Sequence, residues 1–263
     1  MFIDSHCHLG FKDLGSHTKD TEGILKEAQN NGVELILDIA TDVFDFEKYI
    51  NFSNQHDMIY SAIGIHPLHL KENPNFQKQD IIKYLSEPKV IAIGETGLDY
   101  YYAKDEEALQ KKYFEQHAEI CSEYKLPIII HTRDAAEDTL DMLTSFSKNW
   151  GVGGVIHCFS GDVALAKKFL DIGFYISLSG IVTFKKSTDL HEVAKYVSKD
   201  KILTETDAPY LAPNPYRGKI NKPAYVRHTA EFIAELRGQL VSDFTADVKS
   251  NFFTLFNKIN AKR

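Results

Sequence analysis

The sequence predicts a single α/β domain over residues 1–263, folded as a (β/α)8 TIM barrel with a C-terminal closing helix. Short apolar segments of strand length alternate with longer amphipathic segments. Several short segments are apolar without alternation, which is typical of parallel strands covered by helices. Residue types that bind metals follow these segments along the whole chain. Their side chains can meet only in a barrel, where the carboxyl ends of all strands surround one opening.

The expected strands are eight apolar runs. They cover residues 2–4, 34–39, 59–63, 90–93, 127–130, 154–156, 174–178 and 201–204. Helical patterns lie between them, for example 106–124 and 162–170; the second begins at Asp162, a residue type that caps helices. Residues 244–259 are predicted to form the closing helix. A doubly wound sheet would fit the same alternation, but it would hold its first and eighth strands too far apart to share an ion.

Composition and charge exclude several classes of protein. The 263 residues are 43% hydrophobic and 25% charged, as in an ordinary globular domain. No apolar run reaches the ~18 residues of a membrane span, and the N-terminus does not resemble an export signal. The three cysteines, an odd number, argue against a disulfide framework, so we expect a cytoplasmic protein with no membrane contact. The net charge of −7 disfavours a broad electrostatic binder of duplex DNA.

Six residues at the ends of expected strands form a candidate metal site. They are His6, His8, Glu95, His131, His157 and Asp207. His6 and His8 lie two apart on a strand, so both side chains point to one side and both can bind one ion at ~2.0–2.1 Å. Cys7 points the other way and is expected to pack. Each position alone has a structural explanation, such as a buried core histidine or a capping carboxylate, but six together favour a metal site.

These ligand types indicate a two-metal hydrolase. Two cations polarise a phosphoryl or acyl oxygen and lower the pKa of a water between them. A carboxylate beside that water can take its proton. Asp207 is the candidate base and Glu95 the candidate bridge, so both are the expected catalytic residues. We expect two divalent metal ions per chain, which can be Zn, Mn, Mg or Co. Four imidazoles suit Zn, Mn, Co or Fe better than Mg.

Five motifs resemble those of the TatD family of metal-dependent deoxyribonucleases, within the amidohydrolase-like superfamily. They lie at residues 3–8, 93–100, 131–135, 157–161 and 204–211. The resemblance implies that His6, His8 and Asp207 hold one metal, that His131 and His157 hold the other, and that Glu95 bridges them. Many related barrels use a modified lysine as the bridge. Glu205 matches a further family acid near the metals, which either supports a ligand or occasionally acts as one.

Other residues are candidates for substrate contact. His66, after the third expected strand, either donates to a phosphate or is an ordinary turn histidine. Arg133 is either a phosphate clamp or a partner of Asp134 or Glu137. The loop after Asp207 carries cations and aromatics, including Tyr216 and Arg217; this suits a single strand, or the loop simply packs on the rim of the barrel.

The resemblance implies a 3′→5′ exonuclease acting on single-stranded DNA. An alternative is a two-metal ester or amide hydrolase, such as a D-aminoacyl-tRNA deacylase, and a third is a metal-binding scaffold without turnover. The expected partner is single-stranded DNA or another nucleic acid; the oligomeric state stays open.

Five residues are expected to take no part in the chemistry. His117 and His191 lie on helical patterns and are expected to face solvent; Cys121 and Cys158 are expected to be buried thiols, and Trp150 a packing residue.

Overall fold

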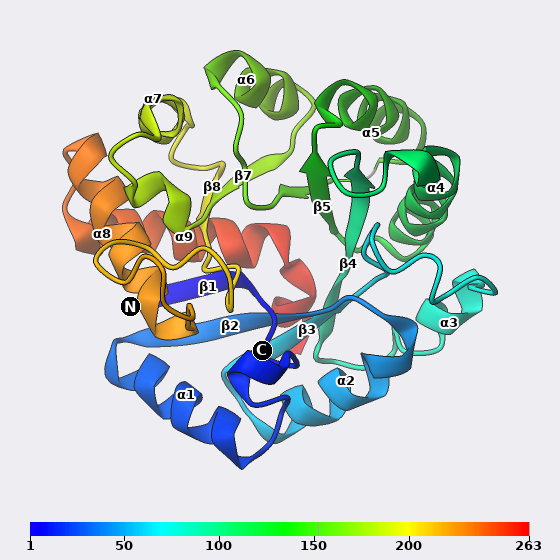
Figure 1. Cartoon of the computed structure of the whole chain (residues 1–263), viewed down its shortest axis with the longest axis horizontal. Helices are drawn as coiled ribbons and strands as arrows, with labels where there is room; N and C mark the ends of the chain where they lie inside the picture. Colours follow the sequence, from blue (N-terminus) through cyan, green and yellow to red (C-terminus); the bar gives the residue numbers. More distant parts are fainter. Residues whose placement is uncertain (152, 263) are drawn as a thin grey trace.

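The computed structural model describes residues 1–151 and 153–262, and it forms a barrel of eight parallel strands surrounded by helices (Figure 1). The strands are β1 (Phe2–Cys7), β2 (Val33–Ala40), β3 (Ile59–Ile63), β4 (Val90–Asp99), β5 (Ile128–Arg133), β6 (Gly154–Ile156), β7 (Tyr175–Leu178) and β8 (Ile202–Thr204). Each strand pairs in parallel with the next one along the chain. All eight expected strands are therefore confirmed, and so is the fold class.

The helices form a ring outside the strands (Figure 1). They are α1 (Lys19–Asn30), α2 (Phe46–Gln55), α3 (Lys78–Ile82), α4 (Glu107–Tyr124), α5 (Ala136–Trp150), α6 (Val163–Asp171), α7 (Thr188–Tyr196), α8 (Val226–Arg237) and α9 (Val241–Leu255). Asp162 caps α6 as predicted, because its carboxylate accepts from the backbone N–H of Leu165 at 2.8 Å. In the described part of the chain, no helix combines the length and apolarity needed to cross a membrane.

The strands are buried on both faces. Ile128, Ile129 and Ile130 of β5 are all fully buried, as are Ile91 and Ile93 of β4. One face of each strand lies inside the barrel and the other lies under helices, which explains why these runs do not alternate.

The barrel closes between β8 and β1. The carboxylate of Asp4 accepts from the backbone N–H of Thr206 at 2.8 Å and from its hydroxyl at 2.6 Å. The backbone N–H of His8 donates to Ala208 at 2.9 Å, and that of Asp207 donates to His6 at 2.9 Å. The seam therefore carries the segment after β8 directly beside the two histidines at the end of β1, His6 and His8.

The closing helix α9 packs against β8 and β1. Asn251 of α9 donates to the carbonyl of Ile202 in β8 at 2.9 Å. The predicted helix over 244–259 is correct in place but wrong at its end, because α9 stops at Leu255 and a 3-10 helix, Asn257–Lys262, follows.

The expectation that His117 faces solvent is wrong. His117 lies on the inner face of α4 and is fully buried. Its Nε2 accepts from the backbone N–H of Ile65 at 3.0 Å, and its Nδ1 donates to the carbonyl of Tyr113 at 2.7 Å. Because each ring nitrogen has a partner, this polar ring is tolerated in the core. Burial lowers the pKa of His117 to about 4.

The remaining side-chain expectations have mixed outcomes. His191 is only half-buried and contacts the carbonyl of Val182 at 2.9 Å, so it is not freely solvated. Cys121 is buried as predicted, whereas Cys158 is only partly buried and lines a cavity. The side chain of Trp150 lies outside the described residues.

Candidate active site

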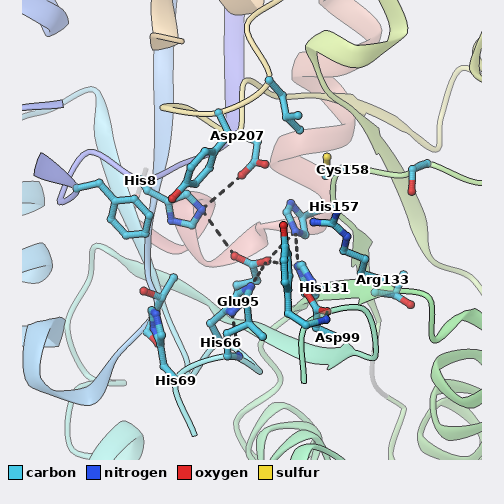
Figure 2. Close-up of a pocket in the computed structure, with 18 of the residues that line it drawn as sticks. His8, His66, His69, Glu95, Asp99, His131, Arg133, His157, Cys158 and Asp207 are labelled. Atoms are coloured by element: carbon cyan, nitrogen blue, oxygen red, sulfur yellow. Dashed lines mark hydrogen bonds and ion pairs between the residues drawn. The ribbon is translucent and has the colours of Figure 1, made fainter. Parts of the chain in front are cut away.

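Five of the six predicted ligand residues line a cavity of about 600 Å³ at the carboxyl ends of the strands, and the sixth, His6, lies directly beside His8 and Glu95. This volume lies in the range of small-molecule and cofactor sites. Figure 2 shows Glu95 between two groups, with His8 and Asp207 on one side and His131 and His157 on the other. Glu95 lies within β4 and is 2% exposed, so its carboxylate is held by a buried strand.

The first group joins β1 to the segment after β8. The Nε2 atoms of His6 and His8 are 3.3 Å apart. Asp207 Oδ1 lies 3.8 Å from His6 Nε2 and 3.4 Å from His8 Nε2, and Glu95 Oε2 lies 3.4 Å and 3.7 Å from the same two nitrogens. Two ligands held ~2.1 Å from one ion in tetrahedral geometry are about 3.4 Å apart. The spacing of these atoms therefore fits a shared cation.

The second group lies around the other oxygen of Glu95. His131 Nδ1 and His157 Nε2 approach Glu95 Oε1 at 2.8 Å and 2.7 Å and lie 3.5 Å from each other. His66 Nε2 lies 3.4 Å from the same oxygen. Since each oxygen of Glu95 faces different imidazoles, this carboxylate is placed to bridge two cations.

For His8 and His131, a hydrogen bond on the far side of the ring fixes which nitrogen faces the cavity with a lone pair. His8 Nδ1 lies 3.1 Å from the carbonyl of Ile39, which can only accept, so Nδ1 carries the proton and Nε2 is free to bind. His131 Nε2 donates to Asp99 Oδ2 at 3.0 Å, which leaves Nδ1 as its binding atom.

His66 has the opposite arrangement. Its Nδ1 accepts from the backbone N–H of Leu68 at 3.1 Å. The neutral ring must therefore carry its proton on Nε2, the atom that faces Glu95. Burial lowers the pKa of His66 to about 4, so the ring is neutral near pH 7. His66 is therefore a hydrogen-bond donor toward the cavity rather than a metal ligand.

Glu205 lies beneath the cavity and is fully buried. Its Oε1 accepts from the backbone N–H of Cys158 at 2.7 Å and faces His157 Nδ1 at 3.3 Å. Its Oε2 and the Nδ1 of His6 have no hydrogen-bond partner among the described residues. Glu205 is therefore placed to orient His157, and His6 lies close to both residues, since the three each offer an atom within 4.8 Å of the other two.

The electrostatics of the carboxylates and imidazoles reinforce each other. Burial raises the pKa of Asp207, but the contact with His8 and the nearby imidazoles of His157 and His6 outweigh it and hold that pKa below its ordinary value. Burial is likewise outweighed at Glu95, where the charge of His157 and the hydrogen bonds with His131 and His157 hold the pKa well below its usual range. Both acids are therefore carboxylates at neutral pH, as metal binding and proton acceptance require.

Asp99 is a site residue that the sequence reasoning missed. It is the last residue of β4 and is 1% exposed. One of its oxygens accepts from His131, and the other accepts from the backbone N–H groups of Tyr101 and Tyr102 at 3.0 Å and 2.8 Å. Its position inside the motif at 93–100 was the only signal, because periodicity cannot show which partner a strand-end carboxylate takes.

The predicted substrate residues divide into two sets. Arg133 lines the cavity, and its guanidinium lies 4.2 Å from the ring centroid of Tyr101. Among the described residues the Arg133 guanidinium lies against the rings of Tyr101 and Tyr102 and forms no ion pair with Asp134 or Glu137. Tyr216 and Arg217 are not among the residues that line the cavity.

The loop of Tyr216 and Arg217 packs against its own neighbours. Tyr216 stacks on Tyr225 with ring centroids 4.0 Å apart, and the Arg217 guanidinium lies 4.3 Å from the ring centroid of Phe184. Their role in substrate binding therefore stays a prediction.

Comparisons with known proteins cover the whole chain. The model of a family described as TatD related DNase matches residues 3–257, a range that contains all six candidate ligands. The metal-dependent hydrolase YcfH of Escherichia coli strain K12 is 42% identical over 263 residues, which is 100% of this chain and 98% of that protein. The metal-dependent hydrolase YabD of Bacillus subtilis strain 168 is 37% identical over 97% of this chain and 99% of that protein. The crystal structure of YJJV, a TatD homologue of Escherichia coli K12, matches with a TM-score of 0.91 at 28% identity, covering 97% of this chain and 98% of the other.

Proposed function

Because this chain belongs to the TatD-related DNase family of metal-dependent hydrolases, we propose that it is a 3′→5′ exonuclease acting on single-stranded DNA with two divalent cations per chain. The observation that carries the proposal is the position of Glu95, whose two oxygens face two separate groups of imidazoles. A single cation would need only one such group, and a purely structural carboxylate would not need four histidines around it.

Each candidate ligand has a role in this proposal. His6, His8 and Asp207 would hold one cation, His131 and His157 the other, and Glu95 both. Zn, Mn and Co suit this imidazole-rich set better than Mg. When bound, the two cations supply charge stabilisation for the phosphoryl oxygens and a lowered pKa for the attacking water.

The chain's own residues move the proton and orient the phosphate. Asp207 is the base, since its carboxylate lies at the cavity and keeps a low pKa. His66 donates from Nε2 to an oxygen of the phosphate, because its other nitrogen is occupied by Leu68. Arg133 contacts a phosphate from the edge of the cavity, where its guanidinium has no carboxylate partner among the described residues. The three free cysteines support a reducing compartment such as the cytoplasm.

End-labelled oligonucleotides test the proposal. The protein is stripped of metal, reconstituted separately with Zn, Mn, Co and Mg, and given single-stranded DNA labelled at either end. A 5′ label should give a ladder of progressively shorter strands, whereas a 3′ label should appear at once as a mononucleotide. Glu95→Ala and Asp207→Asn are the matched inactive controls. Release of a D-amino acid from D-aminoacyl-tRNA, with no cleavage of DNA in any metal, would establish the alternative activity instead.

A further inference from the structure

Two aromatic groups flank the cavity, one beside each candidate metal group. The first lies beside His131 and consists of Tyr101, Tyr102 and Arg133; we call it the β4 wall. The ring centroids of Tyr101 and Tyr102 are 4.7 Å apart in an edge-to-face arrangement. The Arg133 guanidinium lies 4.2 Å and 4.7 Å from the two rings. Tyr102 lines the cavity yet is 62% exposed, so much of its surface is uncovered beside the reaction centre.

The β4 wall is held rigidly. Asp99 accepts from the backbone N–H groups of both tyrosines while its second oxygen accepts from His131. Gln110 of α4 is 1% exposed and donates to the carbonyls of Asp99 and Ala103 at 3.1 Å and 2.7 Å. The turn that carries Tyr101 and Tyr102 is therefore fixed relative to the candidate metal ligand, so the exposed rings lose little conformational entropy when a ligand packs on them.

The second group lies beside His8 and consists of Phe11 and Tyr210; we call it the β8 wall. The Phe11 ring stacks on His8 at 4.7 Å with an interplanar angle of 13°. Tyr210 meets Phe11 edge-on at 6.2 Å, lines the cavity and is 54% exposed. The buried side chain of Asn221 donates to the carbonyl of Tyr210 at 2.6 Å and fixes this segment.

The walls stand on opposite sides of Glu95. In Figure 2, Arg133 lies on the His131 side of Glu95, while His8 and Asp207 lie on the other side. A phosphate held at Glu95 would therefore have one exposed aromatic surface on each side. Exposed tyrosine faces offer sequence-independent stacking to any nucleobase, and Arg133 adds a cation for the backbone.

We propose that the two walls are nucleobase-stacking positions on either side of the reacting phosphate, with Tyr102 taking one base and Tyr210 the other. The inference rests on the proposed function and specifies its substrate. The two bases that flank the cleaved phosphodiester must separate and stack on opposite walls, so neither of them can be base-paired. A base pair would keep each base bound to its complement, and only a frayed or single-stranded end would reach the cavity.

The test combines protein variants that lack a tyrosine ring with DNA substrates that lack a base, so that each ring can be matched to the base it stacks on. The substrates are a single strand of DNA and two versions that lack one base, each with an abasic spacer on one side of the first cut. On the intact strand, Tyr102→Ala and Tyr210→Ala should each lower kcat/KM by roughly 5- to 150-fold, which corresponds to losing one stacked base. On each abasic strand, one tyrosine has no base to stack on. The alanine variant of that tyrosine should cleave this strand with the same kcat/KM as the wild type does.

Four controls separate stacking from structural support. Tyr102→Phe and Tyr210→Phe should keep most of the activity, because the ring is retained. Tyr196→Ala on α7, an exposed tyrosine that does not line the cavity, should match the wild type. The alanine variants should bind as much metal as the wild type and hydrolyse methyl nitrophenyl phosphate, a diester without bases, at the wild-type rate.

The outcomes distinguish this inference from the proposed function. Equal losses on the intact and abasic strands, a parallel loss on the small diester, or no loss on any strand would each overturn the stacking positions while leaving a single-strand exonuclease intact. A wild-type protein that cleaves no single strand would contradict the proposed function, and the stacking positions would fall with it.

Discussion

Glu95 and Asp207 differ in their surroundings, and this difference separates their proposed roles. Glu95 is 2% exposed and has imidazoles against both oxygens. Asp207 is more exposed, faces His8 with one oxygen and has a left-handed backbone with φ of 56°. Aspartate tolerates this region better than most residues, and the bond from its N–H to His6 holds it there. Glu95 is therefore placed to hold both cations, whereas Asp207 is placed to reach water as well as one cation.

Replacing Asp207 with Asn should separate metal binding from proton transfer. Asp207→Asn keeps an oxygen toward His8 but removes the base. We expect hydrolysis to fall roughly 100- to 10,000-fold while much of the bound metal is retained. Metal analysis and single-turnover rates on the same preparation measure the two effects. Near-normal activity would refute Asp207 as the base.

Removing the support of His131 should weaken metal binding. Asp99→Ala leaves His131 Nε2 without its acceptor and frees the turn of Tyr101 and Tyr102. Metal affinity or activity should fall roughly 10- to 100-fold. Titration of the metal-free protein with Zn measures the affinity, and an unchanged value would show that Asp99 only shapes the turn.

His117 should make the stability of the protein depend on pH. Its folded pKa of about 4 lies below the ordinary value of 6.5, so the unfolded chain takes up a proton that the folded protein does not. The stabilisation is complete above pH 6.5 and is lost as pH falls toward 4, by about 3 kcal/mol at most. Denaturant unfolding across this range should show a shallower pH dependence for His117→Gln than for the wild type. If the free energy of unfolding of both proteins changed equally with pH, His117 would not be the source of the pH dependence.

At the scale of elements, the sequence predicts strands better than it predicts helix faces. Consecutive isoleucines in β5 have no polar side and can only be buried, so their pattern identifies a covered strand. A histidine on α4 is consistent with either face, because burial depends on partners such as the Ile65 N–H that lie far away in sequence. Asp99 is ambiguous for the same reason. The convergence of the candidate ligands was predictable because strand ends in a barrel meet whatever the loops do.

In the segment after β8, the composition of the sequence suggests more substrate contacts than the structure places at the cavity. Its interleaved cations and aromatics suggest a nucleic-acid contact, yet Lys222 pairs with Glu27 at 2.8 Å and Arg227 with Glu231 at 2.7 Å. Composition alone cannot tell a tyrosine that faces the cavity, such as Tyr210, from one that stacks on a neighbour, such as Tyr216.

The seam between β8 and β1 should be a weak point if its side-chain bonds are lost. Asp4→Ala leaves the buried N–H and hydroxyl of Thr206 without their acceptor. Each unpaired buried group costs about 1–3 kcal/mol, so the free energy of unfolding should fall by several kcal/mol. Urea unfolding measures the loss, with Asp162→Ala at the α6 cap as a control that should cost about 1 kcal/mol. Similar losses in both variants would show that Asp4 does not hold the seam.

At the scale of the whole molecule, closing the barrel creates the site. The candidate ligands lie in β1, β4 and β5 and in the segments that follow β1, β6 and β8. Only a closed sheet brings all of these positions to one mouth. The core does not need these mouth residues, so site variants should fold. Each aromatic wall lies beside one group of candidate ligands, and in our proposal the cavity between the walls would hold both the cations and the substrate.

The most direct test of the central claim is the metal content of the reconstituted protein and of Glu95→Ala, measured by elemental analysis after dialysis against Zn or Mn. The two-metal account predicts close to two ions per chain in the wild type and a clear loss in Glu95→Ala, with the variant still folded by circular dichroism. A wild type that stays metal-free after reconstitution with Zn, Mn and Mg, or a Glu95→Ala variant that holds as much metal as the wild type, would contradict it.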